Sequence, residues 1–523
     1  MSPAKQTKQL EIEFDTVPPD ASSQFESMRA QGYTLASAIA DLIDNSISAK
    51  SKNVWIELEW EGFDSWISIT DDGTGMTERE LVSAMKVGSR SPLDERAETD
   101  LGRFGLGLKT ASCSQARRFT VITRPTAEET FLRRWDLDWL AANPEHGWAL
   151  LRSAHENTGD RASGLDQQGL KSGTQVLLEG LDRLVGTSPE YSDEDLEHHR
   201  DNFLREIDEV REHLEMVFHR FLSRHGRNGL KIHINGAEIE PWDPFLEAHS
   251  ATQNKGTHKK SFGDHQKPVE VCGFVLPHKD KFKPGEHPKA GGPEGWNAHQ
   301  GFYVYRGERL IIAGDWLGLG WKQEEHYKLA RIRLDIPNSM DREWTITSTK
   351  SSASPPPPLR RWLKNLAADT RGSAVEVYRH RGAYGPKKKR AKRQKRPWIS
   401  KSTQRGYTYK IDRKHPVLAP LIKALPKPSR DTLEVLLLLI EETVPVRQMW
   451  IDYKEHENDV APPFGDRSSD DLRETIMILF DTMTSGNSSD PEVAWKHIGD
   501  CEAFQSRNAQ AIIATLREES SHG

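Results

Sequence analysis

The sequence predicts an α/β protein of several domains that ends in a mostly helical region. Its 523 residues exceed one ordinary hydrophobic core, and this length favours about two to four domains. Segments typical of an amphipathic helix and of strands alternate near the N-terminus, and further strand-like phrases lie at 301–316 and 329–337. Helical patterns with suitable N-caps then occupy much of the region after residue 415.

Composition places the chain among water-soluble proteins. Apolar residues make up 36% and charged residues 29%, and no apolar run is long enough to span a bilayer. The first residues lack the apolar stretch of a secretion signal, and the three cysteines are far apart, without metal-ligand spacing. We therefore expect a cytoplasmic protein, or a nuclear one if the source is eukaryotic, with no membrane segment, disulfide framework or zinc site.

The segment that contains residues 35–47 is predicted to form an amphipathic helix. Leu35, Ile39 and Leu42 recur at helical spacing on its apolar side. Asp41 and Asn45 are four residues apart, so they present a carboxylate and a carboxamide on one face. Taken alone, this pair is typical of a solvated helix face.

Two strands are expected next, and the second ends in an unusual turn. The segments "NVWIELEW" and "WISIT" are rich in β-branched and aromatic residues. The second runs into "DDGTGM" (71–76), where Gly73 and Gly75 permit positive φ or close backbone approach beside Asp71. Thr77 and Glu80 then have the spacing of a capping box and predict a short helix.

A glycine-rich segment, "GRFGLGLKTAS" (102–112), opens another predicted helix. Free N–H groups and the helix dipole favour anions at such a turn, and Lys109 adds a positive charge. The segment matches neither the dinucleotide fingerprint nor the Walker pattern, because no strand leads into it and the Gly-Lys-Ser/Thr ending is missing.

Four motifs in a fixed order carry a family resemblance. "DLIDN" (41–45), "DDGTGM", "GRFGLG" and "SGTQVLLEGL" (172–181) resemble the motif blocks of the GHKL ATPase superfamily: gyrase B, heat-shock chaperones of the ninety-kilodalton class, histidine kinases and MutL. The resemblance covers about residues 25–185 and implies a Bergerat α/β sandwich, with ATP and Mg²⁺ as cofactors.

The resemblance implies an adenine site around the opening turn. Asp71 takes the position that accepts the adenine amino group, and a buried carboxylate selects such a donor. Gly73 and Gly75 let the backbone pass close to the base, and Met76 packs against it. Thr174 resembles the threonine that supports this aspartate and a bridging water.

The same resemblance implies the phosphate contacts. Asn45 takes the place of the asparagine that ligates magnesium, a hard cation that keeps several waters and needs few protein ligands. The glycine block, with Gly102, Gly105, Gly107 and Lys109, is expected to close over the phosphates as a lid.

Two catalytic residues are expected by the same comparison. Asp41 stands where hydrolysing members carry a glutamate that activates water; aspartate is one methylene shorter, which leaves open whether turnover is fast. Asp44 is a rival that lies rotated away on the helix. Lys350, in "TSTKSS", is the candidate for the lysine that reaches the γ-phosphate from the following domain; an exposed loop lysine is an equal alternative.

These observations give a domain plan. We expect an N-terminal extension (1–24), the ATP-binding domain (25–190), a connecting helix with a transducer-like α/β domain (191–375), a basic linker (376–405) and a mostly helical C-terminal domain (406–523). "GFYVYRGERLIIAGDW" (301–316) resembles the transducer domain of gyrase B, MutL and, most closely, the MORC family. The layout of the predicted C-terminal helices resembles the tails of bacterial MORC-like ATPases, and this resemblance implies that the protein can accompany DNA methylases and nucleases in restriction-type or defence systems.

The basic run at 387–396 has three interpretations: a solvated linker, a phosphate-backbone contact, or a nuclear localisation signal. The net charge of −6, from 72 basic and 78 acidic residues, makes no global case for nucleic acid. The leading functional hypothesis is a Mg-ATP hydrolase that cycles between open and closed states, by dimerising on ATP, in a DNA-associated process. The alternatives are a nucleotide-gated clamp with little turnover and a chaperone-like ATPase.

Overall fold

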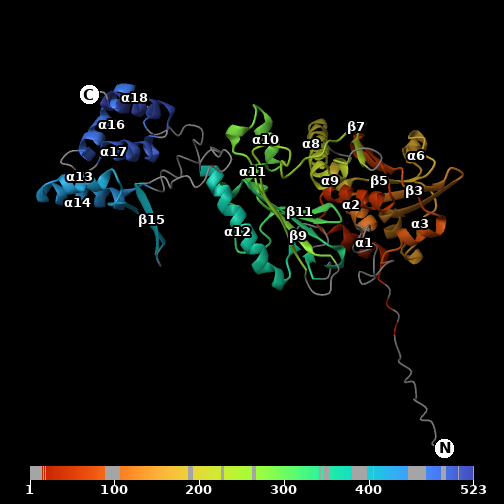
Figure 1. The fold of residues 1–523 in the computed structure, drawn as a ribbon. Coiled ribbons are helices and arrows are strands. Elements are labelled where there is room, and N and C mark those ends of the chain that lie inside the picture. Colours follow the sequence, from red (N-terminus) through yellow and green to blue (C-terminus); the bar gives the residue numbers. More distant parts are fainter. Residues whose placement is uncertain are drawn as a thin grey trace, which may run out of the picture. The chain divides into compact units, whose positions relative to one another are not determined.

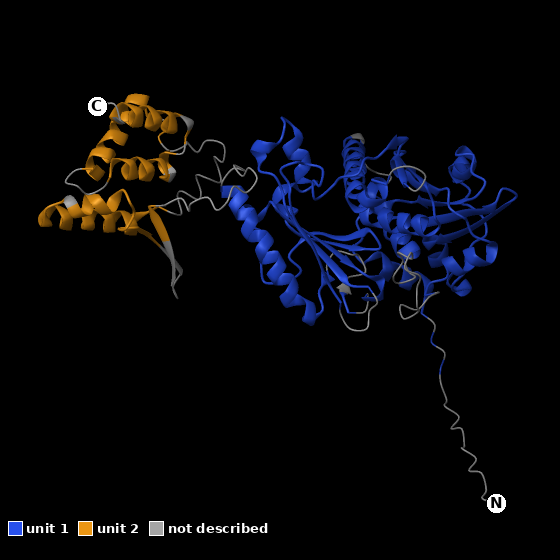
Figure 2. Cartoon of the chain, in the orientation of Figure 1, with its two compact units in different colours: residues 1–384 blue, residues 385–523 orange. Residues whose placement is uncertain are grey.

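The computed structural model describes residues 19–88, 107–186, 192–224, 229–261, 267–340, 343–346, 353–379, 397–403, 406–445, 467–484, 490–504 and 506–521, together with residues 15, 17 and 464. The chain divides into two compact units, residues 1–384 and 385–523 (Figure 2). The predicted α/β class with C-terminal helices is confirmed.

A mixed seven-stranded sheet is the first element of unit 1 (Figure 1). Its strands, in spatial order, are β4 (Glu129–Asp136), β3 (Arg118–Thr126), β5 (Gly173–Glu179), β2 (Trp66–Asp71), β1 (Asn53–Glu59), β6 (Lys231–Ile234) and β7 (Ala237–Glu238). Only β1 and β6 pair in parallel; the other neighbours are antiparallel. The β6–β7 hairpin turns through Asn235 and Gly236, as the Asn-Gly pair predicts.

Helices cover this sheet mainly on one face. They are α1 (Ala21–Arg29), α2 (Leu35–Ser48), α3 (Glu78–Met85), α4 (Gly107–Gln115), α5 (Leu137–Ala142), α6 (Gly164–Gln167), α7 (Asp182–Val185), α8 (Asp193–Val217) and α9 (His219–Leu222). The main core joins α2 and α8 to the inward residues of β1 and β2. Helix α6 packs on the opposite face, over β2 and β5.

Local sequence signals set the ends of these helices. The Thr34 side chain accepts from the Ser37 backbone N–H and caps α2. The predicted capping box of Thr77 and Glu80 is present at α3. Each cap satisfies N–H groups that the first helical turn leaves without partners.

A second sheet of five strands completes unit 1. Its strands, in spatial order, are β11 (Arg309–Asp315), β10 (Gly301–Arg306), β12 (Ala330–Ile336), β9 (Val269–Val275) and β8 (Gln253–Lys260). Helix α12 (Pro357–Arg379) packs on β9 and β12, and the short helices α10 (Glu286–Gly291) and α11 (Gly295–Ala298) contribute to the same core. The strands β13 (Thr345–Ile346) and β14 (Ala353–Ser354) form a separate pair.

Unit 2 combines a hairpin with helices. The hairpin strands are β15 (Trp398–Thr403) and β16 (Gly406–Ile411), and the helices are α13 (Leu418–Ala424), α14 (Lys427–Thr443), α16 (Ser469–Thr484), α17 (Pro491–Gly499) and α18 (Arg507–Ser521). The core of this unit is formed largely by α16, α17 and α18. In the part of the chain that the structure describes, no helix has the length and apolar character needed to cross a membrane.

The turn after β2 is pressed against the end of β3. Gly75 has φ +64°, and a Cβ on it would lie 2.1 Å from the carbonyl oxygen of Arg124. This glycine is therefore required by both backbone conformation and space.

We expect Gly75→Ala to lower the free energy of unfolding by about 2–5 kcal/mol, because positive φ and steric conflict act together. Gly32→Ala is the matched control: Gly32 has φ +74° but nothing within 4 Å of an added Cβ. It should lose only about 1–2 kcal/mol. Urea unfolding measures both, and equal losses would show that the contact with β3 contributes nothing.

Candidate functional site

A buried carboxylate lies at the end of β2. Asp71 is 6% exposed, and its oxygens accept from Ser46 Oγ (2.9 Å), Ser51 Oγ (3.1 Å) and the Gly73 backbone N–H (2.8 Å). Burial raises the pKa of Asp71, although these three hydrogen bonds oppose the shift. The result is a fixed hydrogen-bond acceptor at a strand end, which suits a ligand that brings a donor.

The neighbouring carboxylate has a structural task. Asp72 accepts from the backbone N–H groups of Lys52 (2.7 Å) and Asn53 (2.9 Å) and from the Asn53 side chain (2.7 Å). It ties the start of β1 to the end of β2. The two adjacent aspartates of the motif therefore differ in function.

The backbone passes close beside Asp71. A Cβ at Gly73 would lie 2.7 Å from Ser51 Oγ and 2.8 Å from Asp71 Oδ1, so no side chain fits there. Met76 is half-buried, packs against the main core, and donates its backbone N–H to Thr123 Oγ1 (2.9 Å).

Two threonines lie next to Asp71 on the neighbouring strands of the sheet. Asp71 is the register partner of Thr174, and Thr174 is the partner of Thr123. Directly opposite residues place their side chains on the same face. The hydroxyl groups of Thr123 and Thr174 are 3.0 Å apart. Asp71, Thr174 and Thr123 thus lie side by side on adjacent strands.

Helix α2 carries the other predicted residues of this region. Asn45 is exposed, and its Nδ2 donates to the Asp41 carbonyl oxygen (3.3 Å). A carboxamide with its nitrogen engaged in this way has an oxygen to offer a hard cation. Asp41 is half-buried, and its Oδ2 accepts from the Tyr33 hydroxyl (3.0 Å). Since Ser46 follows Asn45 and binds Asp71, α2 connects the two parts of the site.

The glycine block is described only in part. Gly107 begins α4, whereas Gly102 and Gly105 lie outside the described residues. Lys109 is 2% exposed, and its Nζ donates to the Ala84 carbonyl oxygen (2.9 Å) near the end of α3. The structure therefore places this ammonium between two helices. Lys350 and the basic run 387–396 also lie outside the described residues.

Sequence reasoning missed several residues of the site. Ser46 and Ser51 hold Asp71, and Tyr33 holds Asp41. Ser46 had a signal, because it directly follows Asn45 on the predicted helix. Tyr33 precedes that helix, and Ser51 lies beyond its end, so periodicity gave no indication of either.

A metal site built from many protein ligands is not found. Among the described residues, no group of three or more His, Cys, Asp or Glu side chains could hold a metal ion. A cation held here would use few protein ligands, as magnesium does.

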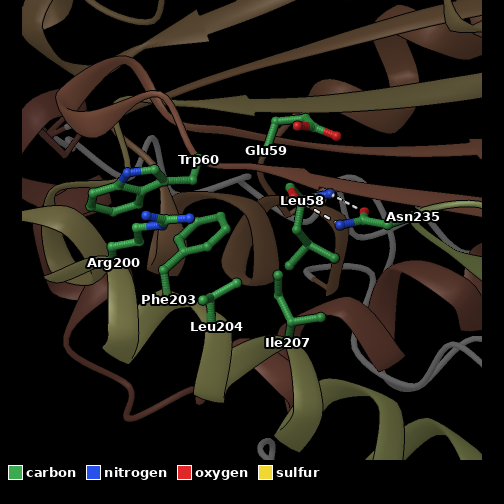
Figure 3. A pocket seen from close by; sticks show the side chains of 8 residues that line it. All are labelled: Leu58, Glu59, Trp60, Arg200, Phe203, Leu204, Ile207 and Asn235. Carbon is green, nitrogen blue, oxygen red and sulfur yellow. Dashed lines mark hydrogen bonds between the residues drawn. The ribbon is translucent and has the colours of Figure 1, made fainter. Parts of the chain in front are cut away.

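A separate apolar pocket of about 320 Å³ lies near the far end of β1 (Figure 3). Trp60, Phe203 and Ile207 line it, and the Asn235 side chain bonds the Leu58 backbone beside it. Asp71 is the register partner of Val54, whereas the pocket begins at Leu58, roughly 13 Å further along the strand. The pocket is therefore distinct from the polar site.

Comparison with known proteins identifies the domain that carries the polar site. Residues 33–165 match the family described as histidine kinase-, DNA gyrase B-, and HSP90-like ATPase. A 99-residue stretch is 30% identical to DNA mismatch repair protein MutL of Acidiphilium cryptum (strain JF-5), covering 19% of this chain and 17% of that protein. A 147-residue stretch is 27% identical to MutL of Streptococcus equi subsp. equi (strain 4047), covering 28% and 19%.

The similarity is confined to a part of each protein. The matched stretches span less than a fifth of the length of these relatives. A solved structure, the N-terminal domain of a DNA repair protein, aligns over 68% of this chain and 98% of its own chain, at 12% sequence identity. The TM-score of this alignment is only 0.39. The family match includes the strand end that carries Asp71 and the helix that carries Asp41 and Asn45: residues 33–165 are similar to ATPase domains of the GHKL superfamily.

Proposed function

We propose that the protein binds ATP at Asp71 and hydrolyses it. The single observation that carries this proposal is the buried Asp71 carboxylate, oriented by three donors at the end of a strand. The adenine amino group is a donor that fits this acceptor. Thr174 supports the aspartate from the neighbouring strand, and Gly73 and Gly75 let the base lie against the backbone.

The phosphates would extend from the adenine towards α2 and α4. Asn45 would hold Mg²⁺ through its carboxamide oxygen, and the ion would neutralise charge on the phosphates. Gly102, Gly105, Gly107 and Lys109 would form the lid, and Lys350 would contact the γ-phosphate, as the resemblance to transducer domains implies. For Lys109, this role requires that its ammonium leave the Ala84 carbonyl when the lid closes.

Asp41 is the proposed general base. Its carboxylate takes a proton from a water molecule, whose oxygen attacks the γ-phosphorus. The bond between that phosphorus and the bridging oxygen breaks, giving ADP and inorganic phosphate. The Tyr33 hydroxyl donates to Asp41 Oδ2 and so helps to fix the orientation of this carboxylate.

The wider process is proposed to involve DNA. MutL relatives carry the name of DNA mismatch repair proteins, and the run 387–396 supplies eight Lys or Arg side chains. We further propose that the protein dimerises when it binds ATP. We also propose a MORC-like role in defence, in which it acts beside nuclease or methylase subunits. It would act in the cytoplasm or, for a eukaryotic source, in the nucleus. Co-purification of such a subunit from the native host tests the MORC-like role, and a chain recovered without one contradicts it.

Steady-state ATP hydrolysis tests the function directly. We expect magnesium-dependent turnover that rises with duplex DNA and disappears in Asp41→Asn and in Asp71→Asn. ATP binding should persist in Asp41→Asn and be lost in Asp71→Asn, because only the second change alters the adenine contact. Binding without turnover in the unchanged protein would instead favour the nucleotide-gated clamp. A client-aggregation assay tests the chaperone alternative, because a chaperone would suppress the aggregation of a client protein.

The salt dependence of DNA binding tests the basic run. Each phosphate contact contributes about 0.9 to the slope of log affinity against log salt, so changing the eight cations of 387–396 to Gln should flatten it strongly. Lys255, Lys259 and Lys260 on β8 provide a control, and their change to Gln should leave the slope in place. An interaction insensitive to salt, or a slope unaffected by the run, contradicts the proposal.

A further inference from the structure

An arginine of the second sheet lies buried against the helix that carries the proposed base. Arg309 is the first residue of β11 and is 4% exposed. Its Nε donates to Asp44 Oδ1 (3.1 Å), and one terminal nitrogen is 3.8 Å from Asp41 Oδ1. A single guanidinium therefore faces two carboxylates of α2.

The surroundings of Arg309 hold it in place. Its Cζ lies 5.2 Å from the centre of the Phe218 ring, and it donates to the Leu310 carbonyl oxygen. Burial, and then the positive charge of Arg309, lower the pKa of His213 to about 4, while Asp44 opposes the shift. His213 is therefore neutral near pH 7, and Arg309 supplies the positive charge facing the two aspartates.

Asp41 is held through both of its oxygens. Tyr33 donates to Oδ2, and Arg309 faces Oδ1. Asp41 and Asp44 are three residues apart on α2, where like charges repel unless a cation lies between them. Without Arg309, Asp41 would keep its hydrogen bond from Tyr33 but lose the cation that offsets its repulsion from Asp44.

We propose that Arg309 is the positioning residue for Asp41, so that the hydrolytic site is complete only while the second sheet is docked on α2. The inference rests on the proposed role of Asp41 as base. The length of the side chain makes positioning important. An aspartate base is one methylene shorter than a glutamate, so the orientation of its carboxylate decides whether it contacts the water. The competing explanation is that Arg309 merely neutralises the buried Asp44.

A pair of variants separates positioning from neutralisation. Arg309→Met removes the cation and leaves Asp44 buried without it, which destabilises the fold. Arg309→Met with Asp44→Asn removes both charges, so much of the stability should return. We expect kcat to fall about 10- to 100-fold in both proteins, with KM for ATP changed less than about twofold because the adenine site is intact. Recovery of kcat together with stability would overturn the proposal.

A second measurement needs no turnover. We expect the unfolding midpoints of Asp41→Asn, Arg309→Met and their combination to be non-additive, because the two groups interact. Arg220→Met is the control: Arg220 also pairs a helix of the first part with the second sheet, through Asp335, and its effect should add to that of Asp41→Asn. Additivity of Arg309→Met with Asp41→Asn would refute the contact. If the unchanged protein hydrolyses no ATP, the proposed function fails, but this cycle still decides whether Arg309 and Asp41 interact.

Discussion

The burial of one carboxylate constrains the arrangement of the ATPase domain. An ionised Asp71 in the interior is costly: burial raises its pKa, and three hydrogen bonds oppose that shift. Helix α2 must place Ser46 against it, the loop after α2 must bring Ser51, and Gly73 must leave room for Ser51 and for Asp71 itself. A fold that maintains such a group gains a selective acceptor for a ligand donor.

The same helix connects this acceptor to the second sheet. One face of α2 holds Asp71 through Ser46, and its neighbouring residues Asp41 and Asp44 face Arg309 of β11. A second link lies nearby, where His219 of α9 and Tyr305 of β10 are hydrogen-bonded at 2.7 Å. Displacement of the second sheet would therefore change the surroundings of the proposed base, Asp41, through the loss of Arg309.

Much of this fold could be predicted from local patterns. The apolar spacing of α2, the capping box at Thr77 and the Asn-Gly turn are properties of short segments, and each is present. The contact of Arg309 with Asp44 joins residues far apart in the chain, and no periodicity encodes it. The sequence pattern around Arg309 indicated a strand, but it did not indicate which residue the Arg309 side chain contacts. The β15–β16 hairpin was missed because its polar, lysine-containing strands resemble the basic linker before them.

The roles of individual site residues were less accessible than their positions. The family resemblance places Lys109 at the phosphates, and in this structure its ammonium contacts the Ala84 carbonyl. A lysine side chain is long enough to turn inward, so its target depends on the packing of α3 and α4. Asp71 and Asp72 are adjacent and chemically identical, and only their hydrogen bonds distinguish the ligand acceptor from the strand tie.

Equilibrium binding of ATP and ITP tests the central claim most directly. The two nucleotides differ where adenine carries an amino donor and hypoxanthine a carbonyl acceptor, which would face the Asp71 carboxylate. We expect ITP to bind at least about 100-fold more weakly than ATP, since a site built around one hydrogen bond rejects the analogue lacking it. Equal affinity for ATP and ITP would contradict an adenine site at Asp71.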